Sequence, residues 1–197
     1  IVGDSSNKDL SESMASILGV KVIYPEVTVF PDTEQRVRIP QEVSGQKAYL
    51  LKSIIPPVDS AVMQLSFLVD ALKKNGADKV IGIIPYIPYM RADHIFRTGE
   101  AVPLEVVINM IQDSRLNEII MVDPHSIKIP EMFKIPVHNL SALPMFAHKI
   151  KQLTANSQKP TAITIVSPDM GGIRRLKILD ELLGGGVNQV VINKDRN

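Results

Sequence analysis

Short apolar runs, rich in β-branched residues, alternate along the chain with longer amphipathic stretches. The apolar runs are 1–2, 20–24, 48–55, 80–84, 118–122, 161–166 and 190–192. Runs of this length without polar alternation are typical of strands buried on both faces of a parallel sheet. Strands that alternate with helices predict an α/β protein with right-handed crossovers, in which mainly parallel sheets are flanked by helices.

The stretches between the apolar runs show the spacing of amphipathic helices. Four apolar stripes follow this spacing: Leu10–Met14–Ile17–Leu18, Val62–Leu65–Val69–Leu72, Leu104–Val107–Ile108–Ile111 and Leu176–Leu179–Leu183. Gly19 and Gly184 follow the first and last stripes and are suited to end a helix, whereas Pro103 is suited to a first turn. Each stripe therefore predicts the apolar face of one helix.

One segment near the N-terminus breaks this alternation. Residues 26–30 and 36–39 read as two strands on either side of a Pro31–Asp32 turn, with no helix between them. This pattern predicts a β-hairpin flap that protrudes from the first domain.

The polar stretch 152–160 is the best candidate for a linker, because it holds few apolar residues. It divides the chain into a first α/β domain at 1–151 and, at 152–197, the linker with the start of a second domain. The second domain holds only one βαβ unit, which cannot cover its own sheet. We therefore expect it to be incomplete in this chain.

The composition excludes several functional classes. Of the 197 residues, 45% are hydrophobic and 22% charged, which is ordinary for a globular protein. A net charge of +1 argues against general nucleic-acid binding, and the absence of cysteine excludes a disulfide framework, a thiolate zinc site and a cysteine nucleophile. With no apolar run of about 18–20 residues and no signal peptide, we expect a cytoplasmic protein that does not bind membranes. Ile1 in place of Met indicates an incomplete N-terminus.

Charged side chains follow most of the later predicted strands. They are Arg91 with Asp93 and His94, Asp123 with His125, Asp169 with Gly171 and Gly172, and Lys194 with Arg196. In open α/β sheets, ligands bind beyond the carboxyl ends of the strands. Cations, carboxylates and a glycine-containing turn before a helix, taken together at one edge, predict a polyphosphate–metal site.

Single members of this set also have simpler interpretations. Asp169 is equally suited to cap a helix, and Lys194 and Arg196 to be solvated surface charges. The trio Phe30, Asp32 and Glu34 is also compatible with an ordinary turn, because Pro–Asp favours turns.

A set of short motifs runs through the chain in a fixed order. They are Phe-Pro-Asp-Thr-Glu (30–34), Pro-Pro-Val-Asp (56–59), Ile-Pro-Tyr-Ile-Pro-Tyr-Met-Arg-Ala-Asp (84–93), Gly-Glu-Ala-Val-Pro (99–103), Asp-Pro-His (123–125), Ile-Pro-Val-His-Asn-Leu (135–140), Ser-Pro-Asp-Met-Gly-Gly (167–172) and Lys-Asp-Arg (194–196). Their order and spacing resemble the ribose-phosphate pyrophosphokinase family, the phosphoribosyl pyrophosphate synthetases. The resemblance implies two phosphoribosyltransferase-like domains, the first of which binds ATP. It also implies transfer of the pyrophosphoryl group of ATP to the 1-hydroxyl of ribose 5-phosphate, which gives phosphoribosyl pyrophosphate and AMP.

The resemblance assigns nucleotide contacts to two segments. Phe30, Asp32 and Glu34 resemble the family's adenine-binding loop, which a neighbouring subunit contributes; on an extended segment, alternate positions would share one side. Arg91 resembles the arginine that contacts nucleotide and phosphate, with Asp93 beside it. The resemblance therefore implies a homo-oligomer, at least a dimer and, in the larger assemblies of the family, a hexamer.

The same resemblance assigns metal and catalytic roles. Asp123 and His125 resemble the metal and triphosphate site, and an extended segment would bring them to the same side. Asp169 resembles a second metal ligand or a ribose-side carboxylate. The implied ion is Mg²⁺, held by one or two carboxylates and substrate phosphates. Lys194 and Arg196 resemble the cationic pair of the family's mobile catalytic loop.

Several positions depart from the family pattern. Thr33 replaces a usual Gly, Ala92 replaces a usual Gln, and Lys134 and His138 stand where many relatives have Asp. The family's ribose-5-phosphate loop is absent, and we expect it beyond Asn197. These departures leave open a non-catalytic regulatory relative that assembles with active subunits, although the intact pair of Lys194 and Arg196 favours an enzyme.

Overall fold

The computed structural model describes residues 1–155 and 163–193. The chain forms two compact units, Ile1–Leu140 and Ser141–Asn197. This division lies earlier than the predicted boundary at 151/152, because helix α4 (Leu143–Ala155) packs against α5 (Ile173–Leu183) of the second unit. Residues 152–155 of the predicted linker belong to α4, and the remainder of the linker lies outside the described residues.

The first unit is built around a five-stranded parallel sheet. In spatial order its strands are β1 (Val2–Gly3), β4 (Lys47–Leu51), β5 (Lys79–Ile84), β6 (Glu118–Val122) and β7 (Val137–Leu140). All four pairings are parallel, which confirms the predicted α/β class with a mainly parallel sheet. The apolar runs did not reveal β7, because its sequence Val-His-Asn-Leu is half polar and three of its four residues are exposed.

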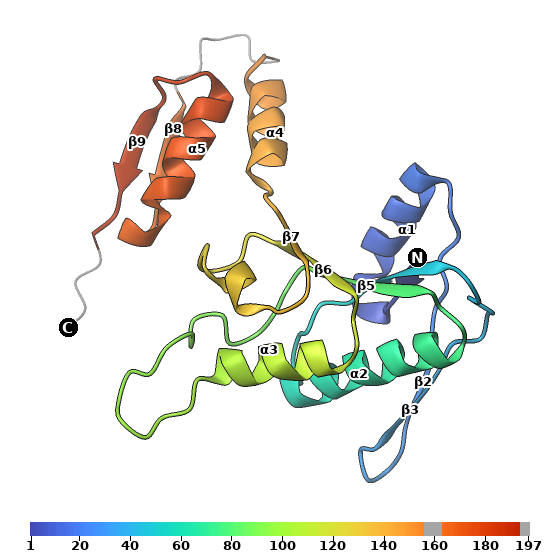
Figure 1. Ribbon diagram of the computed structural model, residues 1–197. Helices are drawn as coiled ribbons and strands as arrows, with labels where there is room; N and C mark the ends of the chain where they lie inside the picture. Colours follow the sequence, from blue (N-terminus) through green and yellow to red (C-terminus); the bar gives the residue numbers. More distant parts are fainter. Residues whose placement is uncertain (156–162, 194–197) are drawn as a thin grey trace. The chain divides into compact units, whose positions relative to one another are not determined.

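Helices cover both faces of this sheet. Figure 1 shows α1 (Lys8–Leu18) on one side and both α2 (Val58–Lys74) and α3 (Pro103–Asp113) on the other. The apolar stripes predicted for α2 and α3 are buried throughout, so both helices turn these stripes towards the core. Pro103 lies in the first turn of α3, and Gly19 ends α1 in the left-handed conformation, as predicted.

The apolar face predicted for α1 does not face the core. Ile17 is 84% exposed and Leu18 63%, whereas the buried residues of this helix are Ser11 and Ala15. The reason is a close approach between α1 and β1: a Cβ on Gly3 would lie 2.5 Å from the Ser11 hydroxyl oxygen. Only small side chains fit between the helix and the strand, so the larger apolar ones lie on the outside.

Strand β1 is the point at which the chain changes direction across the sheet. On one side it pairs with β4, and on the other Ile23 makes a parallel bridge to Val2. The chain passes from β1 through α1 to Ile23 and only later returns to β4. Because parallel crossovers are right-handed, movement in opposite directions puts the crossover helices on opposite faces. The carboxyl ends of β1 and β4 therefore border a topological switch point, where open α/β sheets commonly bind ligands.

The predicted hairpin forms a separate two-stranded sheet. Strands β2 (Glu26–Val29) and β3 (Gln35–Arg38) pair antiparallel, and β3 packs against α2. All four residues of β2 are exposed, whereas β3 alternates between half-buried and exposed positions. The hairpin is thus attached to the first unit through β3.

The second unit contains one βαβ crossover besides α4. Strands β8 (Thr164–Ser167) and β9 (Asn188–Val191) pair in parallel, and α5 connects them after the short 3₁₀ helix η3 (Met170–Gly172). Gly184 ends α5 in the left-handed conformation, as predicted. Within the described parts of the chain, no helix is both long and apolar enough to span a bilayer.

Candidate functional site

The loop after β5 carries Arg91 and Asp93. The backbone amide of Ile54 donates to the Tyr86 carbonyl at 3.0 Å, and that of Ala92 donates to the Tyr89 carbonyl at 2.8 Å. The first bond joins the loop to the segment that follows β4, and the second closes a turn within the loop. Arg91 is exposed and Asp93 half-buried, so both side chains are available at the surface beyond the strand.

The loop after β6 carries Asp123 and His125. Asp123 is half-buried, and its backbone amide donates to the Leu140 carbonyl at 3.0 Å, which extends the pairing with β7. Its φ of 41° lies in the left-handed region, so the backbone turns at this residue instead of remaining extended. The segment is therefore not extended, so the condition under which alternate spacing would bring Asp123 and the exposed His125 to the same side is not met.

Electrostatics link the two loops. His94 Nδ1 lies 2.7 Å from Asp93 Oδ1, and this hydrogen bond lowers the pKa of Asp93 against the opposing effect of burial. The charges of His94 and His125 lower the pKa of Asp93 further. His125 of the loop after β6 thus acts electrostatically on Asp93 of the loop after β5.

The hairpin turn carries the trio Phe30, Asp32 and Glu34. Two backbone bonds of 2.9 Å close the turn: the Phe30 amide donates to the Glu34 carbonyl, and the Thr33 amide donates to the Phe30 carbonyl. Asp32 Oδ1 accepts from the Glu34 amide at 3.1 Å. The trio therefore surrounds a tight turn and does not lie on an extended segment, so the condition for alternate positions to share one side is not met. The Arg36 guanidinium lies 5.7 Å from the centroid of the Phe30 ring, which orients the aromatic face.

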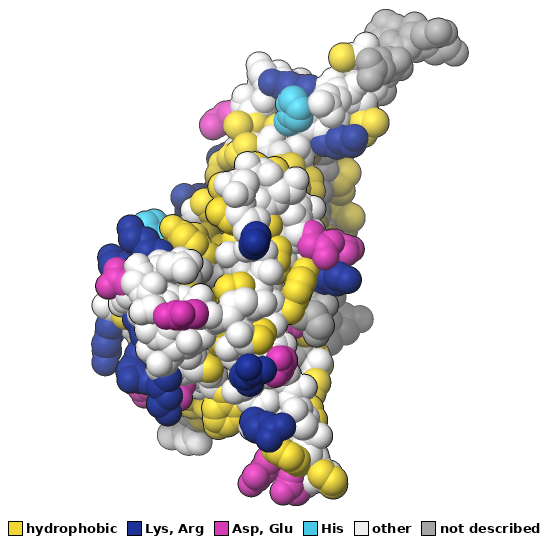
Figure 2. Space-filling view, turned by 90° about the vertical axis from the view of Figure 1, so that its right-hand side faces the viewer, with side chains coloured by type: hydrophobic (Ala, Val, Ile, Leu, Met, Phe, Trp, Pro, Cys, Tyr) yellow, Lys and Arg dark blue, Asp and Glu magenta, His cyan; other side chains and the backbone are white. Residues whose placement is uncertain are grey.

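The surface at this turn combines negative charge with apolar area. The turn is the lowest part of Figure 1, and at the same height Figure 2 shows acidic and hydrophobic side chains together. Phe30 is 39% exposed and Val29 61%. An exposed aromatic ring beside carboxylates can stack on a purine and accept hydrogen bonds from its exocyclic amine.

Asp169 lies in the second unit, directly after β8. It precedes the 3₁₀ helix η3, but its side chain makes no capping hydrogen bond, so the simple capping interpretation is not supported. The Ser167 hydroxyl donates to the Asp169 carbonyl at 2.7 Å, which shapes the turn and leaves the carboxylate exposed. Lys194 and Arg196 lie outside the described residues.

The described parts of the chain offer few ligands for a metal ion. No three His, Asp or Glu side chains gather there into a group that could hold an ion. Mg²⁺ commonly takes one or two carboxylates and completes its shell with water and substrate phosphates. A half-buried Asp123 at a strand end fits that role, since its carboxylate can serve as one ligand without a preformed protein cage.

A buried polar network that the sequence reasoning missed lies at the switch point. Lys52, which follows β4, is hydrogen-bonded to the carboxylate of Asp4, which follows β1; their side chains are only 4% and 9% exposed. Burial alone would raise the pKa of Asp4, but hydrogen bonds from Lys52 and the Ser6 amide, together with the Lys52 charge, lower it. The available signal in the sequence was limited to a lysine inside the otherwise apolar run 48–55 and an aspartate shortly after the run 1–2.

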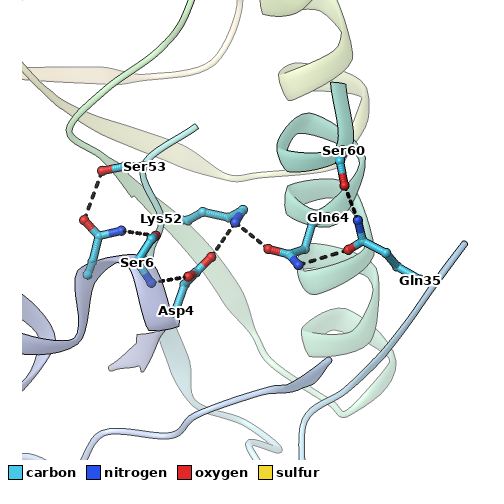
Figure 3. A network of polar contacts seen from close by, with 8 residues as sticks. Asp4, Ser6, Gln35, Lys52, Ser53, Ser60 and Gln64 are labelled. Carbon is cyan, nitrogen blue, oxygen red and sulfur yellow. Dashed lines mark hydrogen bonds and ion pairs between the residues drawn. The ribbon is translucent and has the colours of Figure 1, made fainter. Parts of the chain in front are cut away.

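The network continues through α2 to the hairpin (Figure 3). Lys52 Nζ lies 2.5 Å from Gln64 Oε1, and Gln64 Nε2 donates to Gln35 Oε1 at 2.9 Å. Gln35 Nε2 in turn donates to the Ser60 hydroxyl. A cavity of about 210 Å³ opens beside these residues, lined among others by Asp4, Lys52, Ser60 and Gln64.

Known proteins resemble this chain in sequence and in fold. Residues 1–114 match the N-terminal domain of ribose phosphate pyrophosphokinase. The chain belongs to the ribose-phosphate pyrophosphokinase family. The ribose-phosphate pyrophosphokinase of Aquifex aeolicus is 32% identical over 191 residues, and that of Thermotoga maritima is 33% identical over 184. These alignments cover 97% and 93% of this chain, respectively.

A solved structure from the ribose-phosphate pyrophosphokinase family has the same fold. The crystal structure of phosphoribosylpyrophosphate synthetase from Mycobacterium smegmatis superimposes with a TM-score of 0.87 at 27% identity and covers all of this chain. The chain spans 60% of the length of the Aquifex relative, 58% of the Thermotoga relative and 65% of the Mycobacterium chain. The family and the α/β fold expected from the motifs are thereby confirmed.

Proposed function

We propose that the protein is a ribose-phosphate diphosphokinase, which transfers the pyrophosphoryl group of ATP to the 1-hydroxyl of ribose 5-phosphate and releases AMP. The observation that carries this proposal is the family relationship across the length of the chain, including both units. The charged loops after β5 and β6 support it, because both loops follow neighbouring strands of the parallel sheet and therefore lie at the same edge. A cytoplasmic location belongs to the same proposal.

The proposed roles follow the chemistry of phosphoryl transfer, which depends on positioning and on stabilisation of developing charge. Arg91 and His125 bind the phosphates of ATP, and Asp93 orients His94 within the same loop region. Asp123 would hold Mg²⁺ through its carboxylate, and His125 would be a further ligand where Mn²⁺ replaces Mg²⁺. Asp169 of the second unit is proposed separately, as a second metal ligand or a ribose-side carboxylate. When bound, Mg²⁺ would supply positive charge beside the polyphosphate.

We assign to Lys194 and Arg196 the stabilisation of the phosphoryl group during transfer. Two cations separated by one residue can neutralise the negative charge that develops on the transferred phosphoryl oxygens and on the leaving AMP. This assignment rests on the motif Lys-Asp-Arg alone.

We assign recognition of the adenine base to the hairpin turn. Phe30 stacks on the purine, and Asp32 and Glu34 accept hydrogen bonds from its amine, from a position in a neighbouring subunit. We propose a homo-oligomer on this basis, at least a dimer and in the larger form a hexamer. The second unit then begins a C-terminal phosphoribosyltransferase-like domain.

The decisive experiment is an assay of AMP release that depends on ribose 5-phosphate. The full-length wild-type protein, which includes the ribose-5-phosphate loop expected beyond Asn197, should release AMP only when ATP, Mg²⁺ and ribose 5-phosphate are all present. Lys194→Ala should lower kcat by about 10²–10³-fold, as expected when one preorganised cation is lost, and should change ATP affinity little. The matched control is Lys177→Ala, which removes an exposed lysine of α5 and should leave turnover unchanged. Wild-type protein that binds ATP without releasing AMP would instead identify a regulatory relative.

A further inference from the structure

The hairpin that carries Phe30, Asp32 and Glu34 has little apolar support under β2. All four β2 residues are exposed, and a cavity of about 330 Å³ lies between Val27 of β2 and the Gln64 and Leu68 side chains of α2. Isolated two-stranded hairpins are marginally stable in water. The position of the turn must therefore depend on the contacts that β3 makes with the body of the first unit.

Gln35 is the β3 residue closest to the turn. It follows Glu34 directly and pairs with Val29, the neighbour of Phe30. Both ends of its amide are bonded to α2, the oxygen to Gln64 and the nitrogen to Ser60. Val37, two residues further along β3, packs against the core and supports only the base of the hairpin. Gln35 therefore anchors the part of β3 that determines where the turn lies.

Lys52 determines the direction of each hydrogen bond from Gln64 to Gln35 and Ser60. An ammonium group can only donate, so Gln64 must present its oxygen to Lys52 and its nitrogen to Gln35. Gln35 must then present its oxygen to Gln64 and its nitrogen to Ser60. The buried pair of Lys52 and Asp4 thus imposes one orientation on both amides, and the alternative orientation would bring donors face to face.

We propose that Gln35, oriented through Gln64 by the buried Lys52–Asp4 pair, is a positioning residue that holds the hairpin turn where its side chains recognise adenine. This inference rests on the proposed function, since it takes the turn to be the adenine contact. Gln35 itself touches no substrate. It acts by restricting the hairpin, so its loss should weaken recognition of the base and leave recognition of the phosphates intact.

The test compares two ligands that share the phosphates and differ in the base. Dissociation constants for Mg²⁺–ATP and Mg²⁺–tripolyphosphate are measured by titration calorimetry on three variants and on wild type, with assembly state followed by light scattering. Gln35→Met keeps the side-chain volume and removes both hydrogen bonds. Gln35→Glu retains them, because a carboxylate can accept from the Gln64 amide and from the Ser60 hydroxyl. Arg38→Met is the control on the same strand, since it breaks only an exposed ion pair with Glu26.

Gln35→Met should bind ATP roughly 3–10-fold more weakly, as expected for the loss of one or two net hydrogen bonds, with tripolyphosphate affinity unchanged. Gln35→Glu should restore the preference for ATP, and Arg38→Met should behave like wild type. A Gln35→Met variant that keeps the full preference for ATP, weakens both ligands equally or disassembles would overturn the inference. Wild-type protein that binds neither ligand would instead overturn the proposed function, so the two failures are distinguishable.

Discussion

Replacement of Lys52 by methionine isolates the energetic role of the buried ion pair. The Lys52 side chain is 4% exposed and that of Asp4 is 9% exposed, so Lys52→Met leaves a carboxylate buried without its cation. Breaking a buried pair by removing one partner typically costs about 3–5 kcal/mol. Asp4 keeps the hydrogen bond from the Ser6 amide, so we expect the lower end, about 3 kcal/mol.

The assay is urea denaturation followed by far-ultraviolet circular dichroism at pH 7. With a slope of about 2 kcal/mol per molar urea, the transition midpoint should fall by about 1.5 M. The double variant Asp4→Asn/Lys52→Met should recover most of the loss, because removing both charges leaves no uncompensated ion. Lys8→Met, which breaks an exposed pair with Glu12, is the matched control and should change the midpoint little.

The pH dependence of the unfolding free energy provides a second test of the same prediction. In the wild type the pKa of Asp4 is lowered, so its stabilising effect is present above the pKa of the unfolded chain and is lost as pH falls through the folded value. In Lys52→Met only burial and the Ser6 contacts remain. We expect burial to dominate and to raise the pKa of Asp4, so that protonation stabilises the variant. The difference between wild type and variant should therefore shrink from pH 7 to about pH 4. A loss below about 1 kcal/mol at pH 7, or one that stays constant with pH, would refute the reasoning.

Three further substitutions test the packing and the backbone, each measured by urea denaturation. Leu65→Ala removes a fully buried side chain of α2 and should destabilise the first unit by about 2–5 kcal/mol. Gly172→Ala places a Cβ 2.0 Å from the Ser167 hydroxyl oxygen and should destabilise the second unit by about 1–3 kcal/mol, whereas adding Ser167→Ala should relieve most of the loss. Thr33→Gly should stabilise the hairpin by up to about 1 kcal/mol, because a β-branched residue has a φ of 71° there; an unchanged or lower stability would show that this conformation is not strained.

The positions of most helices and strands could be predicted from the sequence. The stripe of α3 matches its buried residues one for one, and every residue of the α2 stripe is buried, together with Ala61 and Leu68, because a helix that covers a sheet must bury one apolar face. The face of α1 could not be predicted in this way. Its orientation depends on the close approach of Gly3 to Ser11. Because this contact joins two separate segments, it produces no periodic pattern in the sequence.

The candidate site, too, could be predicted only in part from the sequence. The strand-end positions of Arg91, Asp93, Asp123 and His125 followed from the parallel sheet, since its carboxyl ends share one edge. The local geometry did not follow, because backbone turns at Thr33 and Asp123 replaced the extended segments that alternate spacing assumes.

The sequence by itself determined the α/β class, the family and the order of the charged loops, because these depend on local periodicity and on motifs contiguous in the chain. Only the tertiary structure decided that Asp4, Lys52, Gln64 and Gln35 form one hydrogen-bonded line. These residues come from four separate elements, and they meet because β1 pairs with β4 while α2 and β3 pack beside them. Hydrogen bonds act over a few ångströms in space, so no spacing along the chain could reveal them.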